Sequence, residues 1–356
     1  MLPIHLLPFD HIDSVVVLLF VLATCALLIR PTRPNNEPVH LEKSTSALKP
    51  TPYKAGGRFR VMTYNVLCIP EWLGNNTYPR ERMLLLSKKL LELPQNEIPD
   101  VLCLQEMFDP TCVEALTPAL SQLYGYLLYP AGKHWMPIFG QNSGLLIASR
   151  YRIVDAAFMP FSNHIGSDYW AAKGALCASI DLGCGRSVVI MNTHGQADPD
   201  TELLWKFTLD GQTRCKRVRK ENYARAASFV EAFAQKHGAS SSVYCGDFNI
   251  PGEDDEYNSL LSSLGRPVDV YRKCCPKKKG FTYSHKCNVW AVEEGDGRLD
   301  FVFAKNAEAV AAGVLKMRVE DSDAPDTWRK RKEEAPQGAE LSLSDHYPVL
   351  VDVSVI

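Results

Sequence analysis

Apolar runs of β-type residues alternate with helical patterns through most of this 356-residue chain, and no other feature constrains its fold as strongly. The runs that read as strands lie at 59–66, 100–106, 144–150, 173–182, 186–194, 242–249, 298–304, 313–319 and 347–355. Helical patterns lie at 79–93, 111–123 and 213–236. This interleaving predicts an α/β fold in which two β-sheets pack face to face with helices outside them.

Changes in composition along the chain predict four segments. Residues 1–13 form a short N-terminal segment, and residues 14–30 form a transmembrane anchor. Residues 31–57 hold five prolines and end in a glycine pair, so we expect an extended Pro-rich linker that does not pack. Residues 58–356 remain, and about 300 residues suit one large domain rather than two.

The apolar run at 14–29 has two interpretations. At about 1.5 Å per residue it spans about 24 Å, slightly less than a hydrocarbon core of about 30 Å. A secretory signal peptide needs basic residues before the run, but Asp10 and Asp13 precede it, while Arg30 and Arg33 follow it. We therefore expect an uncleaved anchor with the large domain in the cytosol. A secreted or lumenal protein after signal-peptide cleavage is the alternative.

Composition excludes some classes of protein and leaves the redox compartment open. The chain is 46% hydrophobic and 22% charged with a formal net charge of −2, which argues against disorder and against a wholly basic nucleic-acid binder. Eleven cysteines form no C-x-x-C zinc pattern. In a reducing compartment they would act as small buried apolar residues, and in an oxidising one some would pair.

Polar side chains stand where several predicted strands end. They are Asn65, Glu106, Asp247, Asn249 and His346. A buried sheet would present such residues together at one edge. Two carboxylates, two carboxamides and a histidine form a hard-oxygen metal site with a base beside it. Such a site suits Mg²⁺-assisted attack of water on a phosphate ester.

A larger ordered set of residues resembles the endonuclease/exonuclease/phosphatase superfamily, whose fold is DNase I-like. The resemblance covers essentially all of residues 58–356. It implies an α/β fold of DNase I-like form, a four-layer sandwich of two packed, mainly antiparallel β-sheets flanked by helices. Its residues are Asn65, Glu106, His194, Asp247-x-Asn249, Asp300 and Ser344-Asp345-His346.

Finer features resemble the neutral sphingomyelinases of this superfamily. The segment T-H-G-Q-A at 193–197 is similar to their T-H-x-Q-A, although Gly195 stands where leucine is usual. Asp168 and Lys173-Gly174 are similar to their aspartate–lysine pair. The other similar segments are E-M-F-D (106–109), N-S-G-L-L-I-A-S-R (142–150) and V-R-K-E-N (218–222).

Side-chain chemistry assigns the metal and the substrate to this set. Glu106 and Asn65 offer hard oxygens to Mg²⁺, for which Mn²⁺ could substitute, and Asp345 is a further candidate ligand. Asp247 and Asn249 alternate onto one face of a strand end, where they reach the attacking water and the phosphoryl group together.

The two histidines receive different roles. His346 is the candidate general base, and Asp300 would fix its tautomer and raise its basicity. His194 would contact the substrate, where it stabilises the pentavalent phosphorus or protonates the ceramide alkoxide.

Three residues have a structural alternative beside the functional one. Lys173 takes part in catalysis, or it extends its ammonium to solvent. Asp168 holds Lys173 near the phosphate in a loop that closes as a lid, or the two form an ordinary surface ion pair. Asn142 binds phosphate oxygens, or it forms a turn.

The resemblance implies a Mg²⁺-dependent phosphodiesterase of phospholipase C type that acts on sphingomyelin or a related phosphosphingolipid. The alternatives are a nuclease or a phosphoinositide phosphatase of the same superfamily, and a catalytically dead binding module. The expected partner is a membrane lipid and not a nucleic acid. Basic clusters at 214–220, 277–279 and 328–332 either contact anionic lipid headgroups or form solvated faces.

Overall fold

The residues that the structure describes begin at 39, after the predicted anchor. The computed structural model describes residues 39–50, 52–54, 56–71, 76–129, 142–166, 168, 171–198, 211–250, 255–292 and 295–356. The anchor predicted at 14–30 lies outside these ranges. Within them, no helix is both long and apolar enough to cross a membrane.

Two β-sheets form the centre of the fold. The first has the strand order β1 (Leu41–Lys43), β4 (Tyr126–Leu128), β5 (Leu146–Ser149), β3 (Val101–Met107), β2 (Phe59–Cys68), β15 (Val349–Val355) and β14 (Ala307–Val314). The second has the order β10 (Val268–Asp269), β13 (Asp300–Lys305), β9 (Ser241–Asp247), β8 (Arg186–His194), β7 (Gly174–Gly183) and β6 (Arg152–Pro160). The pairs β2–β3 and β8–β9 are parallel, and the other named pairs are antiparallel.

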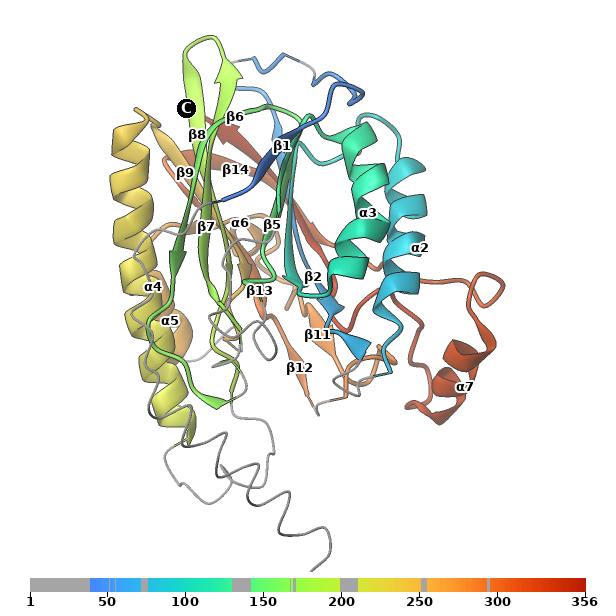
Figure 1. The fold of residues 1–356 in the computed structure, drawn as a ribbon. Coiled ribbons are helices and arrows are strands. Elements are labelled where there is room, and N and C mark those ends of the chain that lie inside the picture. Colours follow the sequence, from blue (N-terminus) through green and yellow to red (C-terminus); the bar gives the residue numbers. More distant parts are fainter. Residues whose placement is uncertain are drawn as a thin grey trace, which may run out of the picture. The chain divides into compact units, whose positions relative to one another are not determined.

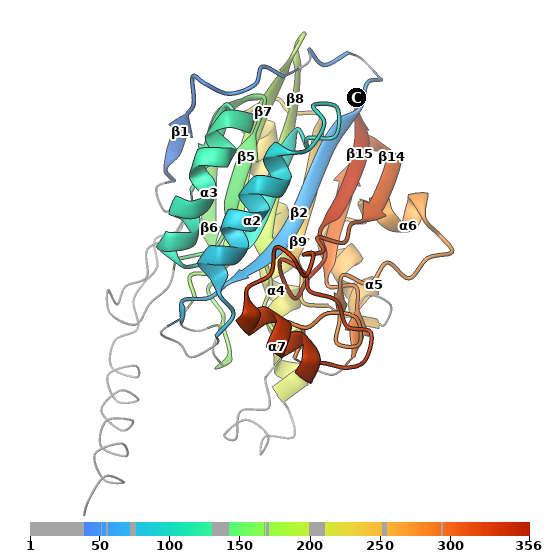
Figure 2. The same ribbon diagram turned by 90° about the vertical axis from the view of Figure 1, so that its right-hand side faces the viewer.

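Helices cover the outer faces of the sheets (Figure 1). The helices α2 (Pro79–Leu91) and α3 (Pro110–Leu123) lie side by side over the first sheet (Figure 2). The helices α4 (Gly211–Lys236) and α5 (Asp255–Ser263) lie against each other, and α4 packs on β7, β8 and β9 of the second sheet. Two short helices follow, α6 (Val270–Cys274) and α7 (Asp326–Glu334). The short strands β11 (Tyr283–Ser284) and β12 (Asp296–Gly297) pair with each other in a separate two-stranded sheet.

Burial explains why this chain adopts four layers. One apolar cluster takes side chains from both sheets, among them Val61, Ile147 and Val302, and therefore fills the space between them. Strand β9 is buried along its whole length, which accounts for its continuous apolar run. In α2, Met83, Leu86 and the other buried residues recur at helical spacing and face the first sheet. The predicted α/β sandwich is confirmed.

Two element predictions were wrong. The strand predicted at 313–319 is instead β14 at 307–314, an alanine-rich strand at the sheet edge whose low β-propensity hid it. The linker predicted at 31–57 packs in part, because β1 pairs with β4 and the hydroxyl of Tyr53 accepts the backbone N–H of Val355 at 2.7 Å. Proline content signalled an extended chain correctly, but an extended chain can still add to an open sheet edge.

Candidate active site

Strand ends from both sheets meet at one polar cluster. In the second sheet His194 pairs with Asp247 and Asp247 pairs with Asp300, so three neighbouring strands present these side chains together. In the first sheet Asn65 and Glu106 lie on the parallel neighbours β2 and β3. The Asn65 amide links the sheets, because its Nδ2 donates to Glu106 Oε1 at 2.8 Å and to Asp247 Oδ2 at 3.0 Å.

Glu106 is held in an unusual backbone conformation at the end of β3. Its φ of 61° is left-handed, and the Gly144 backbone approaches so closely that a Cβ on Gly144 would lie 3.1 Å from the Glu106 Cα. Burial and the nearby charge of Asp345 raise the pKa of Glu106 to about 7. Its Oε2 is buried without a hydrogen-bond partner among the described residues. A bound cation would satisfy this oxygen and favour the ionised carboxylate.

His346 and Asp300 form a buried pair. Asp300 Oδ2 lies 2.7 Å from His346 Nδ1, which leaves His346 Nε2 facing Asp247 Oδ2 at 3.7 Å. Burial lowers the pKa of His346, but the charges of Asp300, Asp345 and Asp247 outweigh this effect and raise it well above the ordinary value of 6.5. Thr282 Oγ1 accepts the backbone N–H of Asp300 at 3.1 Å and so fixes the start of β13.

Lys173 is buried behind His194 with all of its donors engaged. Its Nζ lies 2.7 Å from Asp168 Oδ1, 2.8 Å from the Gly195 carbonyl and 3.2 Å from His194 Nε2. The side chains of Lys173 and Asp168 are only 4% and 10% exposed, so neither the solvent-directed lysine nor the surface ion pair is what the structure has. Burial, Lys173 and His346 hold the pKa of His194 well below its ordinary value.

The segment T-H-G-Q-A is tied to the Asp168 segment and to α4. Asp168 Oδ2 accepts the backbone N–H of Ala197 at 2.8 Å, and Gln196 Oε1 accepts that of Ile165 at 2.8 Å. The Arg219 guanidinium donates to the Gln196 carbonyl at 2.9 Å and forms a buried ion pair with Glu256. Part of the basic cluster at 214–220 therefore points inward. The aromatic residues 169 and 170 of the predicted lid lie outside the described residues.

The other predicted site residues have different placements. Asn249, with a left-handed φ of 53°, donates from Nδ2 to the Gly195 carbonyl at 3.2 Å, so it belongs to the cluster. Asn142 Oδ1 accepts the Gly144 N–H at 2.7 Å, which is a turn contact beside the strand end of Glu106. Asp345 is half-buried, and its Oδ1 lies 3.0 Å from the Ser344 hydroxyl oxygen.

A polar link that was not predicted from the sequence lies beneath the site. Gln105 Nε2 donates to Asn192 Oδ1 at 2.7 Å, and Asn192 Nδ2 donates to the carbonyls of Leu104 and Leu146. All of these groups are fully buried, so the bonds join the two sheets directly below Glu106 and His194. The only signal was a polar residue interrupting each apolar strand, which does not reveal its partner.

The donor set fits a hard divalent cation. Among the described residues, two groups have ligand atoms within 4.8 Å of one another: Glu106, His194 and Asp247 form one, and Asp247, Asp300 and His346 form the other. Carboxylate oxygens dominate both groups and no thiol belongs to either, which suits Mg²⁺ or Mn²⁺. The Asn65 amide oxygen accepts the Leu67 N–H at 3.1 Å, and its nitrogen donates to the two carboxylates; its role as a metal ligand stays a prediction.

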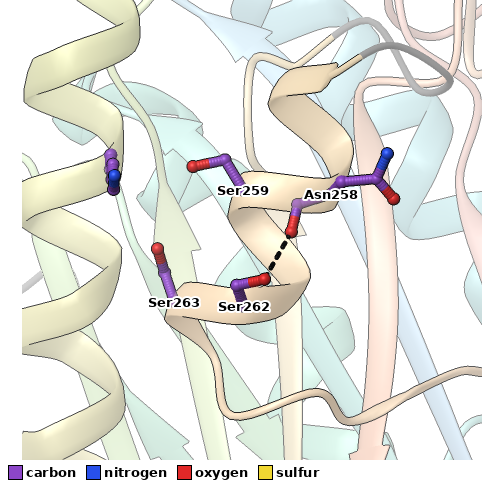
Figure 3. A pocket seen from close by; sticks show the side chains of 5 residues that line it. Asn258, Ser259, Ser262 and Ser263 are labelled. Atoms are coloured by element: carbon purple, nitrogen blue, oxygen red, sulfur yellow. Dashed lines mark hydrogen bonds between the residues drawn. The ribbon is translucent and has the colours of Figure 1, made fainter.

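A pocket of about 490 Å³ lies elsewhere, between α4 and α5 (Figure 3). It is lined by Lys220, Asn258, Ser259, Ser262 and Ser263, and the Ser262 hydroxyl donates to the Asn258 carbonyl within α5 at 2.9 Å. None of these residues belongs to the polar cluster. A substrate of the cluster would therefore bind outside this pocket.

Comparison with known sequences gives a family match and two informative relatives. The profile of the Endonuclease/Exonuclease/phosphatase family matches residues 62–346. Sphingomyelin phosphodiesterase 5 of Danio rerio is 42% identical over 202 residues, covering 51% of this chain and 34% of that protein. Sphingomyelin phosphodiesterase 3 of Rattus norvegicus is 25% identical over 308 residues, covering 72% of this chain and 45% of that protein. The chain spans less than half the length of either relative.

Solved structures share the fold at lower identity. Sphingomyelinase C from Streptomyces griseocarneus superposes with a TM-score of 0.61 at 19% identity, over 83% of this chain and 99% of that chain. A Staphylococcus aureus beta toxin variant with bound magnesium ions superposes with a TM-score of 0.61 at 17% identity, over 84% and 100%. Sequence and fold comparisons thus agree with the sphingomyelinase resemblance of the motifs.

Proposed function

Because this chain belongs to the endonuclease/exonuclease/phosphatase family, we propose that it is a Mg²⁺-dependent phosphodiesterase of phospholipase C type. Its proposed substrate is sphingomyelin or a related phosphosphingolipid, which it hydrolyses to ceramide and the phospho-headgroup. The observation that carries the proposal is the junction of Glu106 and Asp247 through Asn65, beside the His346–Asp300 pair. The proposal is supported because this junction brings the carboxylates of Glu106 and Asp247 close to the imidazole of His346.

His346 would take the proton of the attacking water. Its Nδ1 is engaged by Asp300, so Nε2 is the nitrogen that remains for the proton transfer. The Asp300 carboxylate stabilises the imidazolium that results. Asp247, 3.7 Å from the same Nε2, would orient the water toward phosphorus.

Glu106 and Asp247 would hold the divalent cation, which when bound neutralises charge on a non-esterified phosphoryl oxygen. Asn249 and His194 would donate hydrogen bonds to the phosphoryl group as the bond from water oxygen to phosphorus forms. As the bond from phosphorus to the ceramide oxygen breaks, that oxygen would receive a proton through His194. The Lys173 ammonium, 3.2 Å from His194 Nε2, can replace that proton.

Two further points of the proposal concern the membrane. Residues 14–30 would anchor the chain, with the catalytic domain on the cytosolic side, as the arginines after the apolar run favour. The exposed basic residues Arg214, Arg217 and Lys277 to Lys279 would contact anionic headgroups. Both proposals rest on sequence and charge alone.

A panel of three substrates tests the proposed function. The purified protein is incubated with Mg²⁺ and sphingomyelin vesicles, supercoiled plasmid or a phosphoinositide, and phosphocholine, nicked DNA and inorganic phosphate are measured. Release of phosphocholine that EDTA abolishes supports the proposal. Nicked plasmid without phosphocholine would indicate a nuclease, phosphate release would indicate a phosphatase, and no product from any substrate would indicate a binding module.

A further inference from the structure

Arg82, on α2, is a fully buried arginine whose guanidinium contacts no carboxylate. It is 0% exposed, and within the described part of the chain it forms no ion pair. All of its hydrogen bonds go to backbone carbonyls, and its Cζ lies 5.8 Å from the centre of the Trp290 ring. A charge is rarely buried in this way without a partner, so its contacts call for an explanation.

Three of the four backbone carbonyls that Arg82 binds belong to two segments of the active site, and the fourth is that of Thr77, just before α2. Its Nη1 donates to the carbonyls of Val66 at 2.6 Å and Leu343 at 2.8 Å, and its Nη2 donates to the Leu67 carbonyl. Val66 and Leu67 immediately follow Asn65 in β2. Leu343 immediately precedes Ser344, Asp345 and His346.

The backbone after Asn65 needs donors from outside the sheet. The register between β2 and β3 shifts between Asn65 and Cys68, and Leu67 has a left-handed φ of 48°. The ladder is therefore interrupted at Val66 and Leu67, whose carbonyls are buried with these residues. The planar fork of Arg82 supplies donors to both carbonyls and to Leu343 at the same time.

A second contact joins the same two segments from the other direction. The Ser344 hydroxyl donates to the Asn65 carbonyl at 2.7 Å. Beyond the ladder between β2 and β15, which pairs Thr63 with Val349, one arginine and one serine thus join the segment that carries Asn65 to the segment that carries His346. Asn65 in turn holds Glu106 and Asp247, so a shift at this junction would move the metal site relative to the His346 pair.

We propose that Arg82 is a positioning residue that fixes the Asn65 segment against the His346 segment, and thereby sets the carboxylate metal site in register with the candidate base. The Arg82 guanidinium donates to backbone carbonyls and not to the side chains of the metal site. This inference rests on the proposed function for its catalytic consequence, but its effect on the metal site can be measured without turnover.

The test compares Arg82→Lys with the control variant Arg150→Lys. Arg150 is also buried, but it pairs with Asp100 at 3.3 Å, away from the site. Lysine keeps the charge and loses the fork. We expect Arg82→Lys to weaken Mn²⁺ binding, measured by electron paramagnetic resonance, about 10-fold or more, as for other residues that orient metal ligands. We also expect a similar loss of kcat with KM within about twofold, because the substrate-facing groups remain.

Hydrogen–deuterium exchange provides the readout that locates the effect. In Arg82→Lys, amides in 65–68 and 343–346 should exchange faster together, while Arg150→Lys leaves both segments as in the wild type. The proposal would be overturned if Arg82→Lys and Arg150→Lys had the same affinity for Mn²⁺ and the same rates of amide exchange in 65–68 and 343–346. If the wild type turned over no substrate, the proposed function would fail, but the Mn²⁺ and exchange results would still decide the role of Arg82.

A measurement on the wild type covers the case in which Arg82→Lys does not fold. Saturation with Mg²⁺ should slow exchange in 65–68 and in 343–346 alike, because the two segments are joined through Arg82. Slower exchange in the first segment without the second would contradict the proposal.

Discussion

The buried pair Asp168–Lys173 gives a prediction in which a second substitution restores the stability of the protein but not its activity. Asp168→Ala leaves the Lys173 ammonium buried with the Gly195 carbonyl and His194 but without a counter-charge. Removing one partner of a buried ion pair destabilises a protein by about 3–5 kcal/mol. We therefore expect a lower urea midpoint and a decrease in Tm on the order of 10 °C.

The double variant Asp168→Ala/Lys173→Met should recover most of this stability. Methionine has an apolar side chain of similar length, and replacing a buried pair by apolar groups is often close to neutral. Activity should not recover, because the ammonium beside His194 Nε2 is absent. We expect kcat for sphingomyelin at least about 10-fold below the wild type in both variants, with Mg²⁺ affinity unchanged.

Urea unfolding followed by tryptophan fluorescence, combined with turnover of sphingomyelin vesicles, tests both halves. A double-mutant cycle should give a coupling energy of about 2 kcal/mol or more. Additive losses of stability would show that the two side chains do not act as a pair. Near-wild-type turnover of Asp168→Ala would refute its link to catalysis.

Three further predictions follow from the site and its surroundings. Asp300→Asn removes a charge that raises the pKa of His346, so the acidic limb of the pH profile of kcat/KM should move to lower pH. The maximum of the profile should fall about 10²-fold or more. An acidic limb that does not move would exclude Asp300 as the partner of the base. Gly195→Leu should abolish activity or folding, because a Cβ there would lie 2.0 Å from the Tyr223 hydroxyl, and a fully active variant would mean that α4 gives way. The sequon at 75–77 should stay unmodified in the full chain, and a glycosidase-sensitive mass shift lost in Asn75→Gln would place the domain in the secretory lumen.

Residues at strand ends could be predicted from the sequence because the strands carry a simple signal. Glu106, His194 and Asp247 each close an apolar run, and strands that are neighbours in a sheet bring such residues together. Burial of Lys173 could not be predicted, since its partner Asp168 and its acceptor at Gly195 lie on other segments. The sequence alone showed the residue types and their order. Burial of the two side chains in the structure then ruled out a solvent-directed lysine and a surface ion pair.

Contacts that depend on a single buried polar side chain were beyond prediction. Arg82 reads as one of several charged residues near the start of a helix, and nothing local indicates that Val66 and Leu343 supply its acceptors. The same holds for the bond between Gln105 and Asn192. Strand β14 shows the opposite case, in which alanine-rich sequence concealed an element that pairing with β15 stabilises.

The Mg²⁺ dependence of Glu106→Gln tests the central claim most directly. Glutamine keeps the shape of the side chain and removes the charge, while the hydrogen bond from Asn65 can be retained. Phosphocholine release from sphingomyelin is measured against Mg²⁺ concentration for the wild type and the variant, with circular dichroism as the control for folding. We expect a folded variant whose activity at saturating Mg²⁺ is lower by about 10²-fold or more. Activity above about a tenth of the wild-type rate at saturating Mg²⁺ would contradict the assignment of Glu106 to the metal, because the loss expected there is at least about 10²-fold.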